Sequence, residues 1–231
     1  MLPRTLEPEV MDTVDEAVDY DSMDHSTVNR LFVAELLDFA DKASDSFVDA
    51  ADTIDLGTGT ALIPIELLRQ RPEFGRIFAC DLSQEMLKLA QRRLADEGLD
   101  RDILPVFCDC KRLPIADESC RLIMSNSIVH HIPNPADVFA EIRRTLAPGG
   151  ILFVRDLMRP ESSDAVETIV ETYAGDENAH QQKMFRESLH AALTVEEVQG
   201  LLNDVDLPIE SVFASSDRHW TIALQLQKAS A

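Results

Sequence analysis

Two glycines separated by one residue, with an acid just before them and threonines beside them, are the residues of this chain best suited to ligand chemistry. They lie in the stretch Asp55-Leu56-Gly57-Thr58-Gly59-Thr60. An apolar run over residues 50–56 precedes the glycines, and an apolar pattern of helical spacing begins near Ala61. Glycine has no Cβ and lets the backbone approach a ligand closely, and the start of the helix leaves unpaired N–H groups beside that space. The stretch therefore predicts a strand, a tight glycine turn and a helix at the edge of a ligand site.

Polar residues also follow the next three predicted strands. These strands span residues 76–81, 103–108 and 121–126, and Asp81, Asp109 and Asn126 lie at or directly after their ends. In an open parallel sheet, ligands bind beyond the carboxyl ends of the strands, where the strand order reverses. Asp81 lies about two dozen residues after the first glycine, where an acid accepts both ribose hydroxyls in dinucleotide folds. Asp109 is suited to accept from an adenine amino group, so these residues outline a nucleoside pocket.

Elements that position these residues alternate along the chain. A helix over residues 26–43 precedes the first strand, with Asp24 or Ser26 as N-cap. Its apolar face consists of Val28, Leu31, Phe32, Leu36 and Phe39. Ser83 caps a helix that Gly98 ends. Another helix opens at Asn134-Pro135, and Pro148-Gly149-Gly150 turns the chain into a strand over residues 151–154. This alternation predicts an α/β fold with a parallel sheet covered on both faces.

The last third of the chain is predicted to be mostly helical. Helices are expected over residues 163–173, 178–192 and 194–203, the last opening on a capping box, and strands over residues 209–215 and 219–227 form an antiparallel hairpin at the sheet edge. We expect residues 1–22 to be an acidic arm, ordered in part at best until Tyr20. Residues 23–231 form a single domain in this interpretation, with a helical lid at about residues 160–195.

Net charge and cysteine usage narrow the function classes. The formal charge of −21 disfavours nucleic-acid binding, which needs Lys and Arg to neutralise phosphates, and favours a small-molecule partner. No apolar run reaches the ~20 residues of a membrane span, and the acidic N-terminus does not resemble a signal peptide, so we expect no membrane insertion and a cytoplasmic location. The four cysteines form no CxxC pair and agree with a reducing compartment. Oligomeric state leaves no signal in the sequence.

These residues and their order resemble the class I S-adenosylmethionine-dependent methyltransferases over about residues 20–227. The family's acid-then-Gly-x-Gly motif matches Asp55-Leu56-Gly57-Thr58-Gly59, its ribose acid matches Asp81, and its adenine-contacting acid matches Asp109. Residues 141–150, which end in Leu146-Ala147-Pro148-Gly149-Gly150, are most similar to the small-molecule branch that includes ubiquinone/menaquinone methyltransferases. Thr60 stands at the position where the family's first motif commonly has a third glycine. This substitution affects only the local turn.

The resemblance implies a fold and an activity. The fold is a Rossmann-like, seven-stranded, mostly parallel sheet with one antiparallel strand, helices on both faces, a helical N-terminal cap and a helical insertion before strand 6. The activity is in-line transfer of a methyl group from S-adenosylmethionine to a small-molecule acceptor, with S-adenosylhomocysteine as product. A sulfonium cation with an adenosine group also suits a pocket of carboxylates, whereas a pyrophosphate is repelled by Asp55.

The same resemblance implies cofactor-binding roles for particular residues. Gly57 and Gly59 pass beneath the methionine moiety, Thr58 and Thr60 line the loop, and Asp55 and the backbone near Asn126 hold the amino group. Leu82 and Met86 sandwich the adenine, and Asp109 and the backbone of Cys110 meet its edge. Tyr20 and Met23 close the pocket.

Histidines after the fourth strand are the candidates for a general base. His130 and His131 suit that role because imidazole titrates near neutral pH, and methyl transfer needs a base only if the nucleophile must lose a proton. The alternative is that one is a packed or capping loop residue and the other faces solvent. We expect no metal site, because the acidic arm reads as a solvated face without ligand spacing.

Six further residues are weaker candidates. On the expected lid, Arg186 is able to bind a substrate carboxylate and His180 and His190 lie near it, although solvated helix faces explain all three; Tyr173, Phe185 and Trp220 either line a substrate cavity or belong to the core.

Competing functions use the same fold. A carboxy-S-adenosylmethionine synthase needs a pocket arginine, and a non-catalytic protein would bind S-adenosylmethionine or its product without turnover. Cys108 and Cys110 suggest an arsenic-methyltransferase-like site, but no further His or Cys completes a ligand set. An NAD-dependent oxidoreductase is disfavoured because the third glycine is missing and an acid opens the loop.

Overall fold

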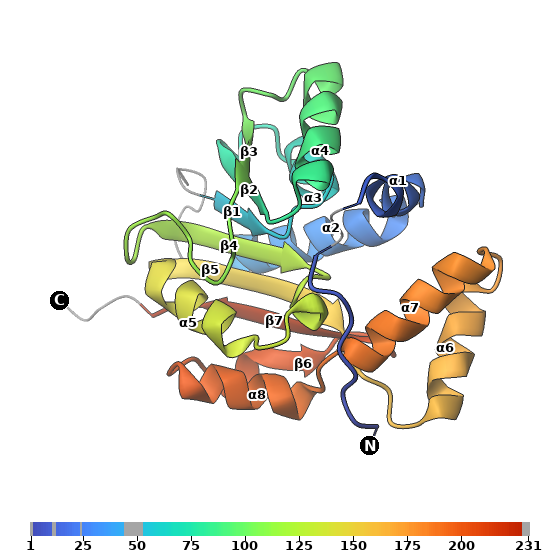
Figure 1. Ribbon diagram of the computed structural model, residues 1–231. Coiled ribbons are helices and arrows are strands. Elements are labelled where there is room, and N and C mark those ends of the chain that lie inside the picture. The colour runs from blue at the N-terminus through green and yellow to red at the C-terminus, as the bar shows by residue number, and fades with distance from the viewer. Residues whose placement is uncertain (1, 11–12, 24, 44–52, 228–231) are drawn as a thin grey trace. The chain divides into compact units, whose positions relative to one another are not determined.

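The computed structural model describes residues 2–10, 13–23, 25–43 and 53–227, and strands alternate with helices along most of that length (Figure 1). The strands are β1 (Thr53–Leu56), β2 (Ile77–Asp81), β3 (Ile103–Phe107), β4 (Cys120–Asn126), β5 (Leu146–Leu157), β6 (Val212–Ala214) and β7 (His219–Gln225). The α-helices are α1 (Val14–Ser22), α2 (Ser26–Lys42), α3 (Leu62–Gln70), α4 (Gln84–Glu97), α5 (Ala136–Thr145), α6 (Ser163–Ala174), α7 (Ala179–Ala191) and α8 (Val195–Asp204). Short 3₁₀ helices are η2 (Val129–His131) and η3 (Ile209–Ser211).

The strands form one seven-stranded sheet in the order β3-β2-β1-β4-β5-β7-β6. β1 pairs in parallel with both β2 and β4, β2 pairs in parallel with β3, and β6 and β7 are antiparallel. The predicted fold, with a reversed last strand and helices inserted before strand 6, is confirmed. The strand order reverses between β1 and β4, so the carboxyl ends of these two strands mark the expected ligand position.

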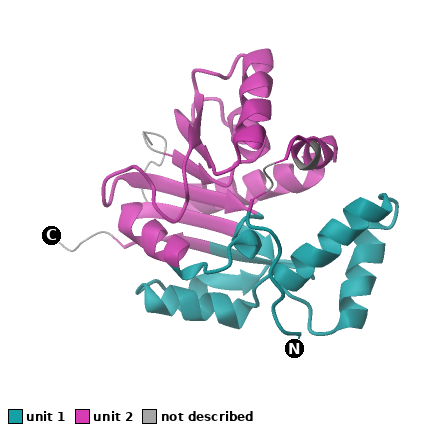
Figure 2. Ribbon diagram, in the orientation of Figure 1, with its two compact units in different colours: residues 1–9, 127–136, 155–222 teal, residues 10–126, 137–154, 223–231 magenta. Residues whose placement is uncertain are grey.

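The described chain divides into two compact units, which Figure 2 colours separately. We call residues 10–126, 137–154 and 223–231 the glycine-loop unit, and residues 1–9, 127–136 and 155–222 the histidine unit. Among the described residues, no helix combines the length and apolar character that crossing a membrane requires.

Apolar residues from α2, α3 and α4 pack with the strands in the glycine-loop unit. Its core contains the fully buried side chains of Phe32, Ile65 and Ile77, and Phe32 packs edge-on against Phe153 at a ring-centroid distance of 5.3 Å. The first helix is fixed to this unit by an ion pair between Asp21 and Arg93 of α4. The glycine loop is therefore anchored on a packed core.

The histidine unit has its own apolar cluster. Leu157 at the end of β5 packs with residues of α6 and α7, including Val166 and Leu189, and Phe185 packs against this cluster. Residues 2–9 belong to this unit: Arg4 donates through Nε to the Ala191 carbonyl at 2.7 Å, and the Thr5 N–H donates to the His190 carbonyl at 3.0 Å.

Several sequence-based boundaries differ from the structure. Residues 14–22 of the predicted acidic arm form helix α1, and Arg4, ahead of that helix, is held by a hydrogen bond to the Ala191 carbonyl. His25 flanks α2 without a side-chain cap; Ser26 is the first helical residue, and Asp24 lies outside the described residues, as do residues 50–52. The predicted strand over residues 209–215 is shorter, because η3 occupies Ile209–Ser211.

Candidate functional site

The glycine loop joins β1 to α3 through a run of left-handed backbone. Gly57 has φ 68°, Gly59 has φ 53°, and Ala61 at the start of α3 has φ 64°. The Thr58 N–H donates to the Cys80 carbonyl of β2 at 2.9 Å, and the Ala61 N–H donates to the Thr58 carbonyl at 2.9 Å. Left-handed φ values cost little only for glycine, which explains both glycines of the predicted motif.

Asp81 at the end of β2 is fixed against this loop. Its Oδ2 accepts from the Gly59 N–H at 2.7 Å and its Oδ1 accepts from the Ser83 N–H at 2.8 Å. Burial raises the pKa of Asp81, although the backbone N–H groups of Ser83, Gly59 and Leu82 oppose this shift. The carboxylate therefore has a single orientation, with lone pairs left for a ligand.

A pocket lies beside the loop, at the reversal of strand order. The space between its walls is about 340 Å³ when the part open to solvent is counted. The lining residues are Tyr20, Asn29, Asp55, Gly57, Thr58, Thr60, Leu62, Ile63 and Asn126. Six of these were predicted from the sequence: Tyr20, Asp55, Gly57, Thr58, Thr60 and Asn126.

Polar atoms of the pocket wall are buried without partners. Asp55 Oδ2, Thr58 Oγ1 and Thr60 Oγ1 have no hydrogen-bond partner among the described residues. Burial raises the pKa of Asp55 to about 7; the Thr58 side chain lowers it in part, and the charge of Asp81 raises it further. Burial together with Asp81, Asp55 and Asp21 raises the pKa of Tyr20 to about 12. Unpaired buried polar atoms cost free energy, so this wall is built to receive polar ligand groups.

The remaining predicted cofactor residues follow β2 and β3. Met86 is buried on the first turn of α4 and Leu82 is half-buried just before it. The Asp109 carboxylate accepts from the Lys111 N–H at 2.9 Å and forms an ion pair with Lys111 Nζ at 3.1 Å, and Cys110 is half-buried beside it. These residues, like Met23 after α1, do not line the described pocket.

Asn29, Leu62 and Ile63 line the pocket but were not predicted. Asn29 is only 8% exposed and lies on the buried face of α2. Asn29 precedes Phe32 and Val33 by three and four residues, so it lies on the same helix face as these apolar residues. A polar residue on an apolar helix face was the sequence signal that could have indicated Asn29 as a pocket residue.

The cysteine pair does not form a ligand set. β3 ends at Phe107, before Cys108, so strand alternation does not bring Cys108 and Cys110 together. Cys108 interacts with the thiol of Cys80 instead, and this interaction and burial raise the pKa of Cys80. None of the four cysteines, all of which lie among the described residues, forms a disulfide.

The two predicted histidines lie in the histidine unit, together with Asp156. His130 is 4% exposed, and its Nδ1 lies 2.5 Å from Asp156 Oδ1. Burial alone would lower the pKa of His130, but the charge and hydrogen bond of Asp156 outweigh it and the net shift is upward. The same contacts with His130 hold the pKa of Asp156 below its ordinary value despite burial, and the short contact suits an Nδ1–H group that donates a hydrogen bond to the carboxylate.

His131 is half-buried, so the alternative in which one histidine faces solvent is wrong. Its side chain is 14% exposed, and its ring centroid lies 4.2 Å from that of His130. Burial and the neighbouring His130 lower the pKa of His131 to about 3. Both rings face Glu7 of the N-terminal segment.

Neither Asp156 nor Glu7 was singled out from the sequence. Asp156 follows an apolar strand run, the same signal that selected Asp55 and Asp81. Glu7 is one of several acids in the first 22 residues and carried no distinguishing signal.

The weaker candidates on α6 and α7 are mostly engaged or exposed. Arg186 pairs with both carboxylate oxygens of Glu167 at 2.7 and 2.8 Å, so its fork is already occupied. His180 is exposed and His190 half-buried. Trp220 is fully buried core, whereas Tyr173 is exposed, with the Arg218 guanidinium 3.3 Å from its ring centroid.

Comparison with known proteins agrees with this geometry. Residues 54–154 match the family model described as a methyltransferase domain. The ubiquinone/menaquinone biosynthesis C-methyltransferase UbiE of Desulfotalea psychrophila is 31% identical over 111 residues, covering 48% of this chain and 43% of that protein. The malonyl-[acyl-carrier protein] O-methyltransferase of Marinomonas sp. is 34% identical over 122 residues, covering 51% of this chain and 44% of that protein. The chain thus spans less than half the length of these curated relatives.

A solved structure extends the similarity to the whole fold. The S-adenosylmethionine-dependent methyltransferase from Aquifex aeolicus superposes with a TM-score of 0.67 at 17% identity, covering 91% of this chain and 97% of that one. The strand order and this likeness show a Rossmann-like α/β fold. The match to the methyltransferase-domain model lies over the part of the chain that carries the glycine loop and the first five strands of the sheet.

Proposed function

We propose that the protein is an S-adenosylmethionine-dependent methyltransferase that acts on a small-molecule acceptor and releases S-adenosylhomocysteine. The observation that carries this proposal is the set of unpartnered atoms at the pocket wall: Asp55 Oδ2, Thr58 Oγ1 and Thr60 Oγ1. A carboxylate and two hydroxyls on a glycine loop suit the amino and carboxylate groups of an amino-acid moiety. The residues present therefore fit this cofactor.

The predicted roles of individual residues form part of the proposal. Asp55 would accept from the amino group, Gly57 and Gly59 would allow close backbone approach, and Asp81 would accept from the ribose hydroxyls. Tyr20 and Asn126 line the same pocket. Leu82, Met86, Asp109 and Cys110 would hold the adenine, and Met23 would help to close the site.

The protein's own task in this reaction is alignment and exclusion of water. When bound, S-adenosylmethionine supplies a methyl group activated by its sulfonium leaving group. The rigid loop and the buried acids fix the position of the methyl donor. Alignment of donor and acceptor is the main contribution that a protein makes to the rate of such a displacement. A base is needed only for an acceptor that must lose a proton, and His130 and His131 are the candidates that the sequence offers for it.

The small-molecule class of acceptor is supported by the relatives. They are described as methyltransferases of ubiquinone/menaquinone biosynthesis and of malonyl-[acyl-carrier protein]. The high negative charge supports the same class by disfavouring nucleic acid. We further propose that the protein works in the cytoplasm, where its four cysteines, none of them in a disulfide, remain reduced.

Calorimetric titration followed by turnover tests is the experiment. We expect saturable binding of S-adenosylmethionine and S-adenosylhomocysteine, and transfer of a labelled methyl group to at least one compound in a panel of phenols, quinols, carboxylic acids and amines. Binding without transfer to any compound would favour the non-catalytic alternative. No arginine lines the described pocket, which gives no support to a carboxy-S-adenosylmethionine synthase.

A further inference from the structure

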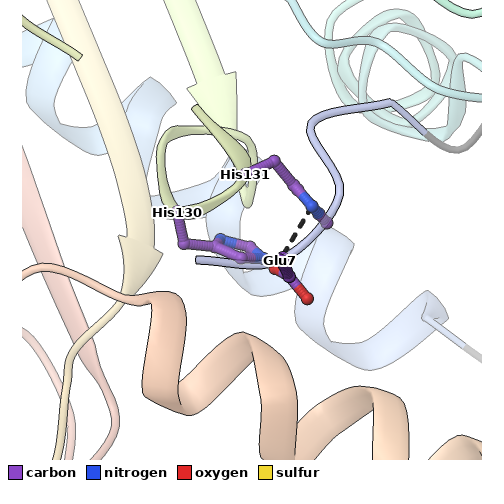
Figure 3. Close-up of side chains that lie close together, drawn as sticks. All are labelled: Glu7, His130 and His131. Atoms are coloured by element: carbon purple, nitrogen blue, oxygen red, sulfur yellow. Dashed lines mark ion pairs between the residues drawn. The ribbon is translucent and has the colours of Figure 1, made fainter. Parts of the chain in front are cut away.

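Three potential ligand atoms converge in the histidine unit (Figure 3). Glu7 Oε1 lies 3.5 Å from His130 Nε2 and 3.2 Å from His131 Nδ1, and all three atoms lie within 4.8 Å of one another. Ligand atoms about 2.1 Å from a metal ion at a tetrahedral angle are separated by about 3.4 Å. The observed spacing therefore suits a shared metal ion.

The opposite ends of two of these side chains are already held. His130 donates through Nδ1 to Asp156 Oδ1 at 2.5 Å, which leaves the Nε2 lone pair directed at Glu7. Glu7 Oε2 accepts from the Ser188 hydroxyl at 3.2 Å, which leaves Oε1 toward the histidines. A carboxylate on the far nitrogen of a histidine is the usual outer-shell arrangement of metal-binding histidines.

The facing atoms are buried and unsatisfied. Glu7 Oε1 and His131 Nδ1 have no hydrogen-bond partner among the described residues, although their side chains are only 10% and 14% exposed. Two buried polar atoms that face each other without hydrogen-bond partners cost free energy unless a third group binds both of them. A cation between the carboxylate oxygen and the ring nitrogens would satisfy both.

The N-terminal segment is positioned to deliver Glu7. The Arg4 guanidinium donates to the carbonyls of His130 at 3.1 Å and Ile132 at 2.9 Å, which ties this segment to the loop that carries both histidines. Arg4 adds one positive charge near the cluster, while Glu7 and Asp156 contribute two negative charges. The balance still favours a cation.

We infer that Glu7, His130 and His131 bind one divalent transition-metal ion through Oε1, Nε2 and Nδ1, with Asp156 as a positioning residue. Two imidazoles and one carboxylate form the ligand set used for Zn²⁺ and for non-haem Fe²⁺, and imidazole selects these ions over Mg²⁺ or Ca²⁺. Three protein ligands leave at least one coordination position open. Ligation of Nε2 and Nδ1 excludes a general-base role for the same nitrogens.

Metal content of the full chain, purified without a histidine tag, tests this inference. We expect about one Zn²⁺ or Fe²⁺ per chain by elemental analysis. After chelation, titration with Zn²⁺, or with Fe²⁺ under anaerobic conditions, should restore the metal and raise the melting temperature. Glu7→Gln and His131→Gln should each weaken Zn²⁺ binding at least about tenfold, as should Asp156→Asn.

His180→Gln is the matched control, because it removes an exposed histidine from the same unit and should leave binding unchanged. Melting temperatures of the metal-free variants show that each is folded. Metal-free purified protein whose melting temperature does not respond to Zn²⁺ or Fe²⁺ would overturn the site, as would equal loss of binding in His180→Gln and Glu7→Gln. The readout does not depend on S-adenosylmethionine, so this site and the proposed function fail separately.

Discussion

The carboxylate of Asp81 is bonded to the backbone of Gly59: the Gly59 N–H donates to Asp81 Oδ2 at 2.7 Å across the start of the glycine loop. The bond joins the end of β2 to the turn that follows β1. Asp81 therefore supports the loop's conformation and, in the proposed function, also accepts from the ribose. Its substitution should affect both stability and binding.

Asp81→Asn should weaken S-adenosylhomocysteine binding about tenfold to a hundredfold. The amide keeps one acceptor oxygen but loses the charge, and hydrogen bonds to charged groups contribute about 1.5–3 kcal/mol. Calorimetry measures the loss. Asp96→Asn on exposed α4 surface is the control and should bind as the wild type does. Equal affinity of Asp81→Asn and wild type would remove Asp81 from the site.

Cofactor affinity should rise with pH until about pH 7 and then level off. Burial raises the pKa of Asp55 to about 7, so below that pH the group is protonated and cannot pair with a ligand ammonium group. Affinity should increase up to about tenfold per pH unit on the rising limb. Calorimetry between pH 5.5 and 8.5, values that bracket this pKa, measures the profile. Asp55→Asn should bind more weakly and show a flat profile; the same slope in this variant would assign the titration elsewhere.

The stability of the cofactor-free protein should change with the opposite sign. The folded pKa of Asp55 is above its ordinary value of 3.8, so the folded state holds a proton that the unfolded state releases. The resulting stabilisation is full below about pH 4 and is lost as pH rises through about 7. Urea unfolding of wild type and Asp55→Asn across this range should show the loss only in the wild type. Parallel curves for the two proteins would contradict the assignment.

Gly59→Ala and Gly200→Ala should change stability in opposite directions. Gly59 has φ +53°, where an alanine costs about 1–2 kcal/mol, and a Cβ there lies 3.9 Å from Tyr20 Cε1 in the pocket wall. Gly200 lies in α8, where a Cβ meets nothing within 4 Å, and alanine should stabilise the helix by about 0.5–1 kcal/mol. Chemical denaturation checks both changes. A neutral or stabilising Gly59→Ala would mean that the loop tolerates another backbone conformation.

Local signals in the sequence predicted much of the fold. Ser83 accepts from the Met86 N–H as an N-cap, and Gly98 ends α4 with φ 70°, both as expected, because caps depend on a few adjacent residues. Thr194 and Glu197 form the predicted capping box.

Contacts between residues far apart in the chain could not be predicted from the sequence. Gly149 and Gly150 are predicted to form a turn, yet β5 already begins at Leu146. The reason is pairing with a distant residue: the Gly149 N–H donates to the Leu226 carbonyl and the Leu226 N–H donates to the Gly150 carbonyl, each at 2.8 Å. No local pattern announces a pairing partner more than seventy residues away.

The buried face of α2 illustrates the same limit. Leu31 was expected to be in the core but is 54% exposed, and Val28 is 36% exposed, while Asn29 is buried at the pocket. The buried face runs instead through Phe32, Val33, Leu36 and Leu37, which pack in the core of the glycine-loop unit.

Asp156→Ala should be among the most destabilising substitutions in the histidine unit. The carboxylate is fully buried and accepts from the N–H groups of Val129 at 2.5 Å and Leu157 at 2.6 Å, as well as from the His130 ring. Removing it leaves these donors unpaired, at a cost of about 3–5 kcal/mol. Urea denaturation measures the change, with exposed Glu171→Ala as control. A loss below about 1 kcal/mol would mean that other groups hold the loop.

Titration of the purified wild-type chain with S-adenosylhomocysteine in a calorimeter tests the central claim most directly. A glycine-loop pocket built for an adenosyl amino acid predicts one saturable site, and Asp55→Asn should weaken it about tenfold or more. Absence of binding at millimolar ligand by folded protein would contradict the account.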